Sequence, residues 1–129
     1  MSTDLSSYQE LYLETSKEQI QVMKDHLESL KKDISDSHAT AEFHRAAHSL
    51  KSKSLVMGFE QLGTVNRQLE AFFLKVKEHE ITLTHEYIQM ISEILTHIEH
   101  ALMDIDKSEH EPDLTEDIKT LKQHTNITN

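Results

Sequence analysis

His48 stands among residues whose types and spacing suit chemistry on an imidazole ring. Lys51 follows three residues later on the same ridge of a helix, so its ammonium group can reach whatever is attached to the ring. Ser52, one turn beyond His48, is small and leaves the ring approachable. A phosphoryl group on Nε2 brings roughly two negative charges, which a neighbouring lysine can offset. These residues therefore suit a phosphoryl group carried on a histidine.

A carboxylate is expected at the same depth as His48. The helical segments on either side of Gly58 predict a hairpin, with His48 ten residues before the glycine and Glu70 twelve after it. At 1.5 Å per residue both side chains lie ~15 to 18 Å from the turn, so they can meet across the groove. A carboxylate that accepts from Nδ1–H fixes the tautomer and leaves a lone pair on Nε2. Such a contact would make Nε2 a positioned nucleophile.

The periodicity of apolar residues predicts that His48 faces water. The core positions of its helix cluster within about 60° of arc, and His48 falls roughly 130° from their mean direction. Three further segments show apolar stripes with helical spacing. With the helix of His48 counted, four stripes result, in chain order: Ile20, Met23, Leu27, Leu30 and Ile34; Phe43, Ala47, Leu50, Ser54 and Met57 in the helix of His48; Leu62, Val65, Leu69 and Val76, with Phe72 or Phe73; and Leu83, Tyr87, Ile91, Ile94, Ile98, Leu102 and Ile105.

Helix boundaries are predicted from capping residues. The first helix is expected to begin near Ser7, where Ser7 and Glu10 have capping-box spacing. Asp36 and its serine neighbours offer an N-cap for the second helix, and Gly58 offers a left-handed residue to close it. Thr82 or Thr84 is expected to cap the fourth helix.

The whole chain favours long helices with short connections, since it has only two glycines and one proline. The sequence predicts an all-α protein, an antiparallel up-down four-helix bundle over residues 1–108. Residues 109–129 are expected to form a short fifth helix and a frayed tail. Pro112 is expected as the first residue of that helix, Leu114, Ile118 and Leu121 would dock it, and Thr125 to Asn129 would fray.

Charge and composition narrow the classes of partner. The chain has 23 acidic and 13 basic residues, a formal net charge of −10, which is the wrong sign for binding nucleic acid or an anionic membrane. It has no cysteine, so disulfides and thiolate metal sites are excluded. No apolar run approaches the ~20 residues of a membrane span, and the first residues lack a signal-peptide pattern. A cytoplasmic protein is expected.

The motif around His48 resembles the signature of histidine phosphotransfer (HPt) domains. The matching positions are His48, Leu50, Lys51, Ser54, Gly58, Leu62, Leu69 and Glu70. The preceding segment, residues 43–47, is most similar to the phosphoacceptor domain of chemotaxis-type histidine kinases. The sequence departs from the family at Ser52, where glycine is usual, and at Lys53, which adds a cation; Ser52 is expected to narrow the approach to His48.

The resemblance implies a phosphocarrier in a two-component phosphorelay. His48 would be the phosphoacceptor, Lys51 would assist the phosphoryl group and Glu70 would orient the ring. The partners would be a response-regulator receiver domain and a hybrid or trans-acting histidine kinase. Four more residues are expected on the partner-docking face: His44, Ser52, Leu55 and Arg67. Leu55 lies one helical repeat beyond His48, where an exposed leucine suits an apolar docking surface.

No cofactor or metal of its own is expected for the chain, and any Mg²⁺ would belong to the receiver. Glu93, His97 and His100 share a helix, but carboxylate-bridged bundles use Glu-x-x-His pairs, and no histidine here follows a glutamate by three. Two glycines are too few for the nucleotide-binding loops of a kinase, so no autokinase activity is expected.

Three interpretations stay open at this point. The chain is a phosphorelay carrier, or a phosphoacceptor module phosphorylated in trans by a histidine kinase, or an acidic helical adaptor in which His48 is incidental. A dimerising kinase helix fits less well, because that pattern has an acid directly after the histidine, where this chain has Ser49. A monomer is therefore expected.

Overall fold

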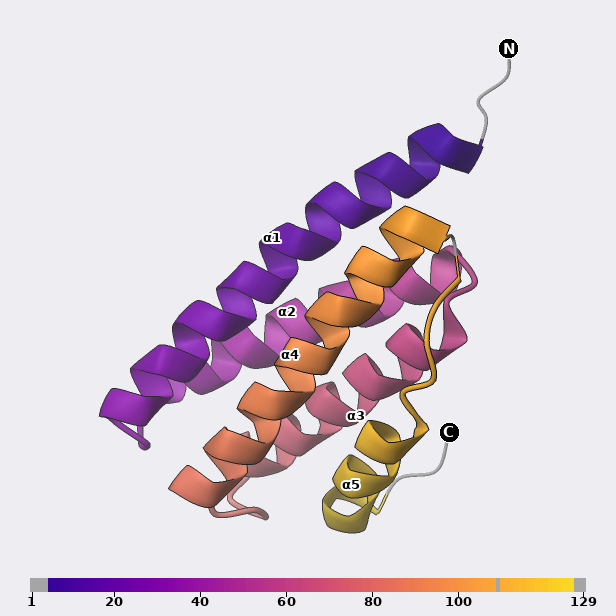
Figure 1. Cartoon of the computed structure of the whole chain (residues 1–129). Coiled ribbons are helices and arrows are strands. Elements are labelled where there is room, and N and C mark those ends of the chain that lie inside the picture. The colour runs from indigo at the N-terminus through magenta and orange to yellow at the C-terminus, as the bar shows by residue number, and fades with distance from the viewer. Residues whose placement is uncertain (1–4, 109, 127–129) are drawn as a thin grey trace.

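The computed structural model describes residues 5–108 and 110–126, which form five helices (Figure 1). They are α1 (Leu5–Lys32), α2 (Ser37–Val56), α3 (Glu60–Lys77), α4 (His85–Ser108) and α5 (Thr115–Thr125). Helices α1 to α4 alternate in direction; α1 packs against α2 and α4, α2 packs against α3, and α5 lies along α3. The predicted all-α four-helix bundle with a short fifth helix is confirmed.

Three predicted helix ends are confirmed. The Asp36 carboxylate accepts a hydrogen bond from the backbone N–H of Ala39 at 3.0 Å, which satisfies one of the free donors at the start of α2. Gly58 has a φ of 82°, the left-handed conformation that ends this helix and turns the chain into α3. The Thr84 hydroxyl accepts from the backbone N–H of Tyr87 at 3.1 Å, so Thr84 caps α4.

One capping prediction and two boundary predictions are wrong. Helix α1 begins near Ser7, as expected, but it already includes Leu5, so Ser7 lies inside the helix and is not its cap. Helix α5 begins at Thr115 and not at Pro112, because the chain on both sides of Pro112 is held against the start of α3. The Glu111 carboxylate accepts from two backbone N–H groups there, at 3.0 and 3.1 Å, and the backbone N–H of Leu114 donates to Gln61 Oε1 at 3.0 Å. Thr125 does not fray, since it is buried and donates to Gln68 Oε1 at 2.5 Å; residues 127–129 of the expected tail lie outside the described residues.

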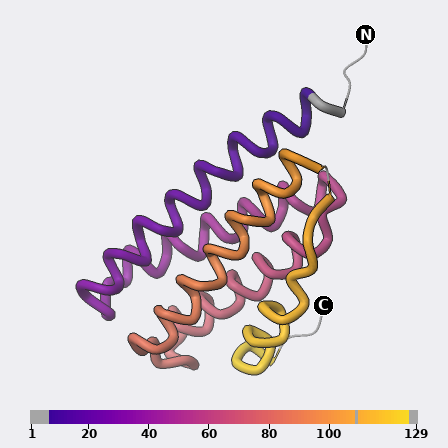
Figure 2. The backbone as a smooth tube through the Cα atoms, in the orientation of Figure 1, coloured from indigo at the N-terminus to yellow at the C-terminus, as the bar shows by residue number. Residues whose placement is uncertain are grey.

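Packing in the core fixes the positions of α2 and α3 relative to each other, and so the positions of the polar residues on their outer side. The rings of Phe43 and Phe73 stack with centroids 4.1 Å apart, and Leu50, Leu62 and Leu69 are fully buried beside them. In Figure 2 the two helices run side by side from the turn at Gly58. Because a packed core resists displacement, side chains on facing ridges of α2 and α3 are held at fixed separations.

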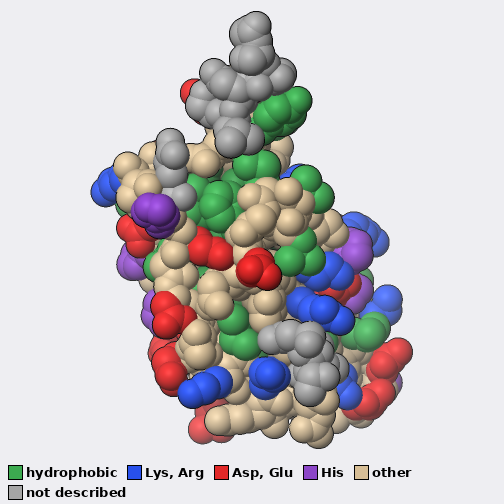
Figure 3. All heavy atoms as spheres, turned by 90° about the vertical axis from the view of Figure 1, so that its right-hand side faces the viewer, with side chains coloured by type: hydrophobic (Ala, Val, Ile, Leu, Met, Phe, Trp, Pro, Cys, Tyr) green, Lys and Arg blue, Asp and Glu red, His purple; other side chains and the backbone are tan. Residues whose placement is uncertain are grey.

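The surface carries charges of both signs. On the face turned toward the viewer in Figure 3, acidic and basic side chains are interspersed and form no continuous patch of one sign. Among the described residues, no helix combines the length and the apolar character needed to cross a bilayer.

Candidate functional site

His48 and Glu70 meet across the groove between α2 and α3. The Nδ1 atom of His48 lies 2.7 Å from Glu70 Oε2, the contact expected from their equal depth in the hairpin. The His48 side chain is 57% exposed, whereas the Glu70 side chain is only 18% exposed. The carboxylate therefore sits at the base of the groove, and the imidazole stands above it with an outward edge.

Lys51 completes the contacts of the carboxylate. Its Nζ atom donates to Glu70 Oε1 at 2.7 Å, so each carboxylate oxygen has its own donor. Burial alone would raise the pKa of the Glu70 carboxyl, but the hydrogen bonds from Lys51 and His48 and their charges outweigh burial and hold the pKa below its usual range. Glu70 is thus an anion at neutral pH, able to hold the Nδ1 proton of His48.

His44 also faces this carboxylate. Its Nε2 atom lies 4.0 Å from Glu70 Oε2, and its side chain is 25% exposed. Burial is the main reason that the pKa of His44 lies below its usual value, and Lys77, His48 and Lys51 lower it further against the opposing effect of Glu70. The sequence predicts His44 on the docking face. In the structure it lies beside the group formed by His48, Lys51 and Glu70.

The other three residues that the sequence predicts on the docking face, Ser52, Leu55 and Arg67, are not among the hydrogen-bond partners of Glu70. Ser52 and Arg67 are exposed on α2 and α3. Leu55 is 48% exposed and leans over α3 at Gly63, where a Cβ atom would come within 2.3 Å of its Cδ2. The missing side chain of Gly63 thus makes room for Leu55 on the surface.

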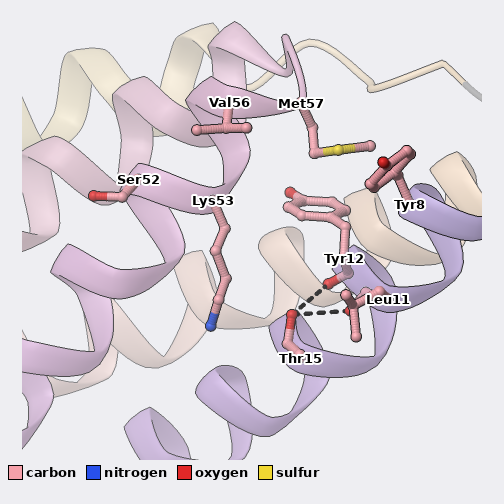
Figure 4. A pocket seen from close by; sticks show the side chains of 8 residues that line it. All are labelled: Tyr8, Leu11, Tyr12, Thr15, Ser52, Lys53, Val56 and Met57. Atoms are coloured by element: carbon pink, nitrogen blue, oxygen red, sulfur yellow. Dashed lines mark hydrogen bonds between the residues drawn. The ribbon is translucent and has the colours of Figure 1, made fainter. Parts of the chain in front are cut away.

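An apolar groove lies between α1 and α2, with a volume of about 350 Å³, and its lining on α2 begins at Ser52, one turn beyond His48. Figure 4 shows that its lining side chains come from the start of α1 and the end of α2, with Met57 close to the two tyrosine rings. The lining residues are Tyr8, Leu11, Tyr12, Thr15, Ser52, Lys53, Val56 and Met57. Leu11 and Val56 are not among the docking residues predicted from the sequence. Both are apolar residues that lie off the buried stripe of their helix, and that position could have identified them.

A second histidine–carboxylate pair joins α4 to α5. His97 Nδ1 lies 2.9 Å from Asp117 Oδ1 and 3.0 Å from Oδ2, with the ring 51% exposed. Sequence spacing gave no sign of this pair, because 20 residues and a connection separate its members. Within the described ranges, no group of three or more histidine and acidic side chains has the arrangement of a metal site.

The geometry at His48 allows nucleophilic chemistry at one atom. When Nδ1 carries the proton and donates it to Glu70, the lone pair remains on Nε2. A nucleophile of this kind can take a group from another protein because the ring stands above its neighbours. The Lys51 cation, already drawn to the site by Glu70, lies close enough to offset negative charge on an incoming group.

Known proteins are similar to this chain in sequence. Residues 7–124 match the family model of the Hpt domain. The chain is 28% identical over 96 residues to chemotaxis protein CheA of Listeria monocytogenes, covering 74% of this chain and 16% of that protein. It is 28% identical over 102 residues to CheA of Bacillus subtilis (79% and 15%), and 27% identical over 113 residues to CheA of Klebsiella aerogenes (88% and 17%). The chain thus spans less than a fifth of the length of these relatives, and by the match over nearly all of its own length it belongs to the Hpt domain family.

Proposed function

We propose that this chain is a histidine phosphotransfer protein that carries a phosphoryl group on Nε2 of His48. The observation that carries the proposal is the 2.7 Å contact between His48 Nδ1 and the Glu70 carboxylate, beneath an exposed ring. In the forward step, the lone pair of Nε2 attacks the phosphorus of an aspartyl phosphate on a receiver domain. The P–O bond to the aspartate breaks, the Nε2–P bond forms, and the aspartate leaves as a carboxylate.

Each residue of the cluster has a role in this step. Glu70 holds the Nδ1 proton and stabilises the positive charge that the ring gains as Nε2 bonds to phosphorus. Lys51 offsets charge on the phosphoryl oxygens. The chain supplies no nucleotide, and Mg²⁺ would be held by the receiver.

The partner that suits the surface beside His48 is a receiver domain that presents an apolar patch next to its aspartate. Val56 is 86% exposed on α2, and Tyr8 and Leu11 are exposed across the groove on α1; Leu55 is exposed beside them on the α3 side of α2. Clustered exposed apolar side chains on one face indicate an interaction surface. Ser52 lies between this surface and His48 along α2, so a partner seated there has its reacting group near the imidazole.

The similarity to CheA favours a second source for the phosphoryl group. The chain resembles a part of chemotaxis protein CheA from three bacteria. A histidine kinase that binds ATP could therefore phosphorylate His48 in trans, and the chain would then pass the group to a receiver. Both routes use the same nitrogen and the same carboxylate.

The test is transfer of labelled phosphate from a panel of phosphorylated receiver domains, with a trans-acting histidine kinase and ATP as a parallel arm. Wild-type protein is expected to gain acid-labile, base-stable label, and His48→Gln is expected to abolish it. His97→Gln is the matched control, because His97 has similar exposure and its own carboxylate partner. Label that survives in His48→Gln refutes the assignment. Unchanged receiver binding by His48→Ala without any transfer would identify the chain as an adaptor.

A further inference from the structure

His44 and His48 face one oxygen atom. His44 lies one turn before His48 on α2, with Nε2 4.0 Å from Glu70 Oε2, and His48 Nδ1 lies 2.7 Å from the same oxygen. The two ring nitrogens are therefore at most 6.7 Å apart, the sum of those distances. A charge that appears on the His48 ring acts on His44 across this short gap.

Before phosphorylation, the surroundings of His44 favour its neutral form. Burial lowers its pKa, and so do the cations Lys77 of α3 and Lys51 of α2, together with His48 when it is charged. Only Glu70 opposes them, and that carboxylate already accepts hydrogen bonds from Lys51 and His48. These surroundings therefore favour an uncharged His44 ring at neutral pH.

Phosphorylation of His48 changes this balance of charges. The transferred group carries about two negative charges, and the ring keeps one positive charge while Nδ1 holds its proton. The site gains one net negative charge in that form, and two if the Nδ1 proton leaves to solvent. We propose that His44 takes up a proton when His48 is phosphorylated, and so compensates for the added negative charge. This proposal rests on the proposed function.

The size of the coupling follows from distance and solvent. The phosphoryl group sits on Nε2 of His48, a few ångströms beyond Nδ1. One to two charges at about 7 to 10 Å, in a partly exposed groove at physiological salt, shift the pKa of a histidine by roughly half a unit. The new charge is negative, so the pKa of His44 rises. Protonation of His44 and phosphorylation of His48 favour each other to the same extent. A rise of half a unit in the pKa of His44 therefore means that phosphorylation is about threefold more favourable when His44 is protonated.

The first test measures His44 directly by NMR titration of the histidine ring signals, in wild-type protein before and after phosphorylation by phosphoramidate. In that reaction the P–N bond of the reagent breaks, ammonia leaves and the Nε2–P bond forms. The pKa of His44 is expected to rise by about half a unit. The ring signals of His97 are the internal control and stay unchanged. An unmoved pKa of His44 in protein labelled at His48 overturns the proposal.

The second test uses the transfer equilibrium with a receiver. From about pH 8 to about pH 6, the wild-type equilibrium is expected to move toward phosphohistidine relative to His44→Gln. The change approaches its limit of about threefold only as His44 becomes protonated in both states. His44→Phe keeps a ring without a titrating group and should match His44→Gln, which separates packing from protonation. Parallel pH profiles of wild type and both variants overturn the proposal. Absence of any label on His48 refutes the proposed function itself, a result that differs from labelled protein with an unresponsive His44.

Discussion

Replacement of Glu70 tests the central geometric argument most directly. The carboxylate accepts from His48 Nδ1 at 2.7 Å and from Lys51 Nζ at 2.7 Å. In Glu70→Gln the side chain keeps its shape and one acceptor oxygen but loses its charge, and its NH₂ group cannot accept from the other donor. In Glu70→Ala both contacts disappear. The two variants therefore separate the effect of charge from the effect of orientation.

The expected losses follow from the strength of the contacts. A hydrogen bond to a charged group contributes about 1.5–3 kcal/mol and a neutral one about 0.5–1.5 kcal/mol. The difference, about 1–1.5 kcal/mol, predicts that Glu70→Gln accepts phosphate about tenfold more slowly. Loss of the whole contact predicts a decrease of up to about a hundredfold for Glu70→Ala.

The assay is the initial rate of label transfer from a phosphorylated receiver to wild type, Glu70→Gln and Glu70→Ala. Helix content and the free energy of unfolding, measured for the same samples, distinguish lost chemistry from lost folding. Receiver affinity is expected to stay within a few-fold of wild type, because Glu70 lies at the base of the groove between α2 and α3. If folded Glu70→Ala accepts phosphate at the wild-type rate, the carboxylate does not orient His48.

Two further predictions concern the docking surface and the core. Val56→Asp is expected to weaken receiver binding by about tenfold or more in a titration. The control is Met103→Asp, which replaces an exposed apolar residue on α4 and should leave the affinity unchanged. Equal affinities of the two variants would exclude the α1–α2 groove as the docking site. Burial raises the pKa of Tyr12 to about 12, although its hydrogen bond with Ser54 lowers that pKa, so the unfolded chain loses the phenol proton first as the pH rises. The free energy of unfolding should then fall between pH 10 and 12 by about 1.4 kcal/mol per unit more in wild type than in Tyr12→Phe, as urea titrations would show.

The His48–Glu70 contact was within reach of sequence analysis because it depends on regular geometry. A glycine that ends one helix and a short turn set the register of the hairpin, and a constant rise per residue then places His48 and Glu70 at equal depth. Local capping was equally readable at Asp36 and Thr84, where a side chain bonds to its own helix. The helical period likewise separated the exposed face of α2 from its core face.

Contacts between segments that are distant in the sequence could not be predicted from helix geometry or local capping. Glu111 caps the start of α3 from a connection 50 residues away, and Gln61 Oε1 returns a hydrogen bond by accepting from the backbone N–H of Leu114. These bonds delay the start of α5 past Pro112, although proline at a first helical position is a good local signal. Thr125 is buried for a similar reason, because its partner Gln68 lies on another helix. The spacing of Leu114, Ile118 and Leu121 predicted that α5 docks, and all three are buried. The polar contacts that set the ends of α5 come from distant segments, which no local pattern encodes.

The His48–Glu70 and His97–Asp117 pairs together show why a histidine–carboxylate contact alone does not define the site. His97 with Asp117 has nearly the exposure and the Nδ1 contact of His48 with Glu70. The difference lies in what surrounds the carboxylate: Glu70 binds Lys51 on its second oxygen and has His44 within 4.0 Å, whereas both oxygens of Asp117 face the same ring nitrogen. An incoming phosphoryl group brings negative charge, which a bare acid–imidazole pair would repel. We therefore expect acceptance of phosphate at position 48 to depend on the Lys51 cation beside Glu70 as much as on the orientation of the ring.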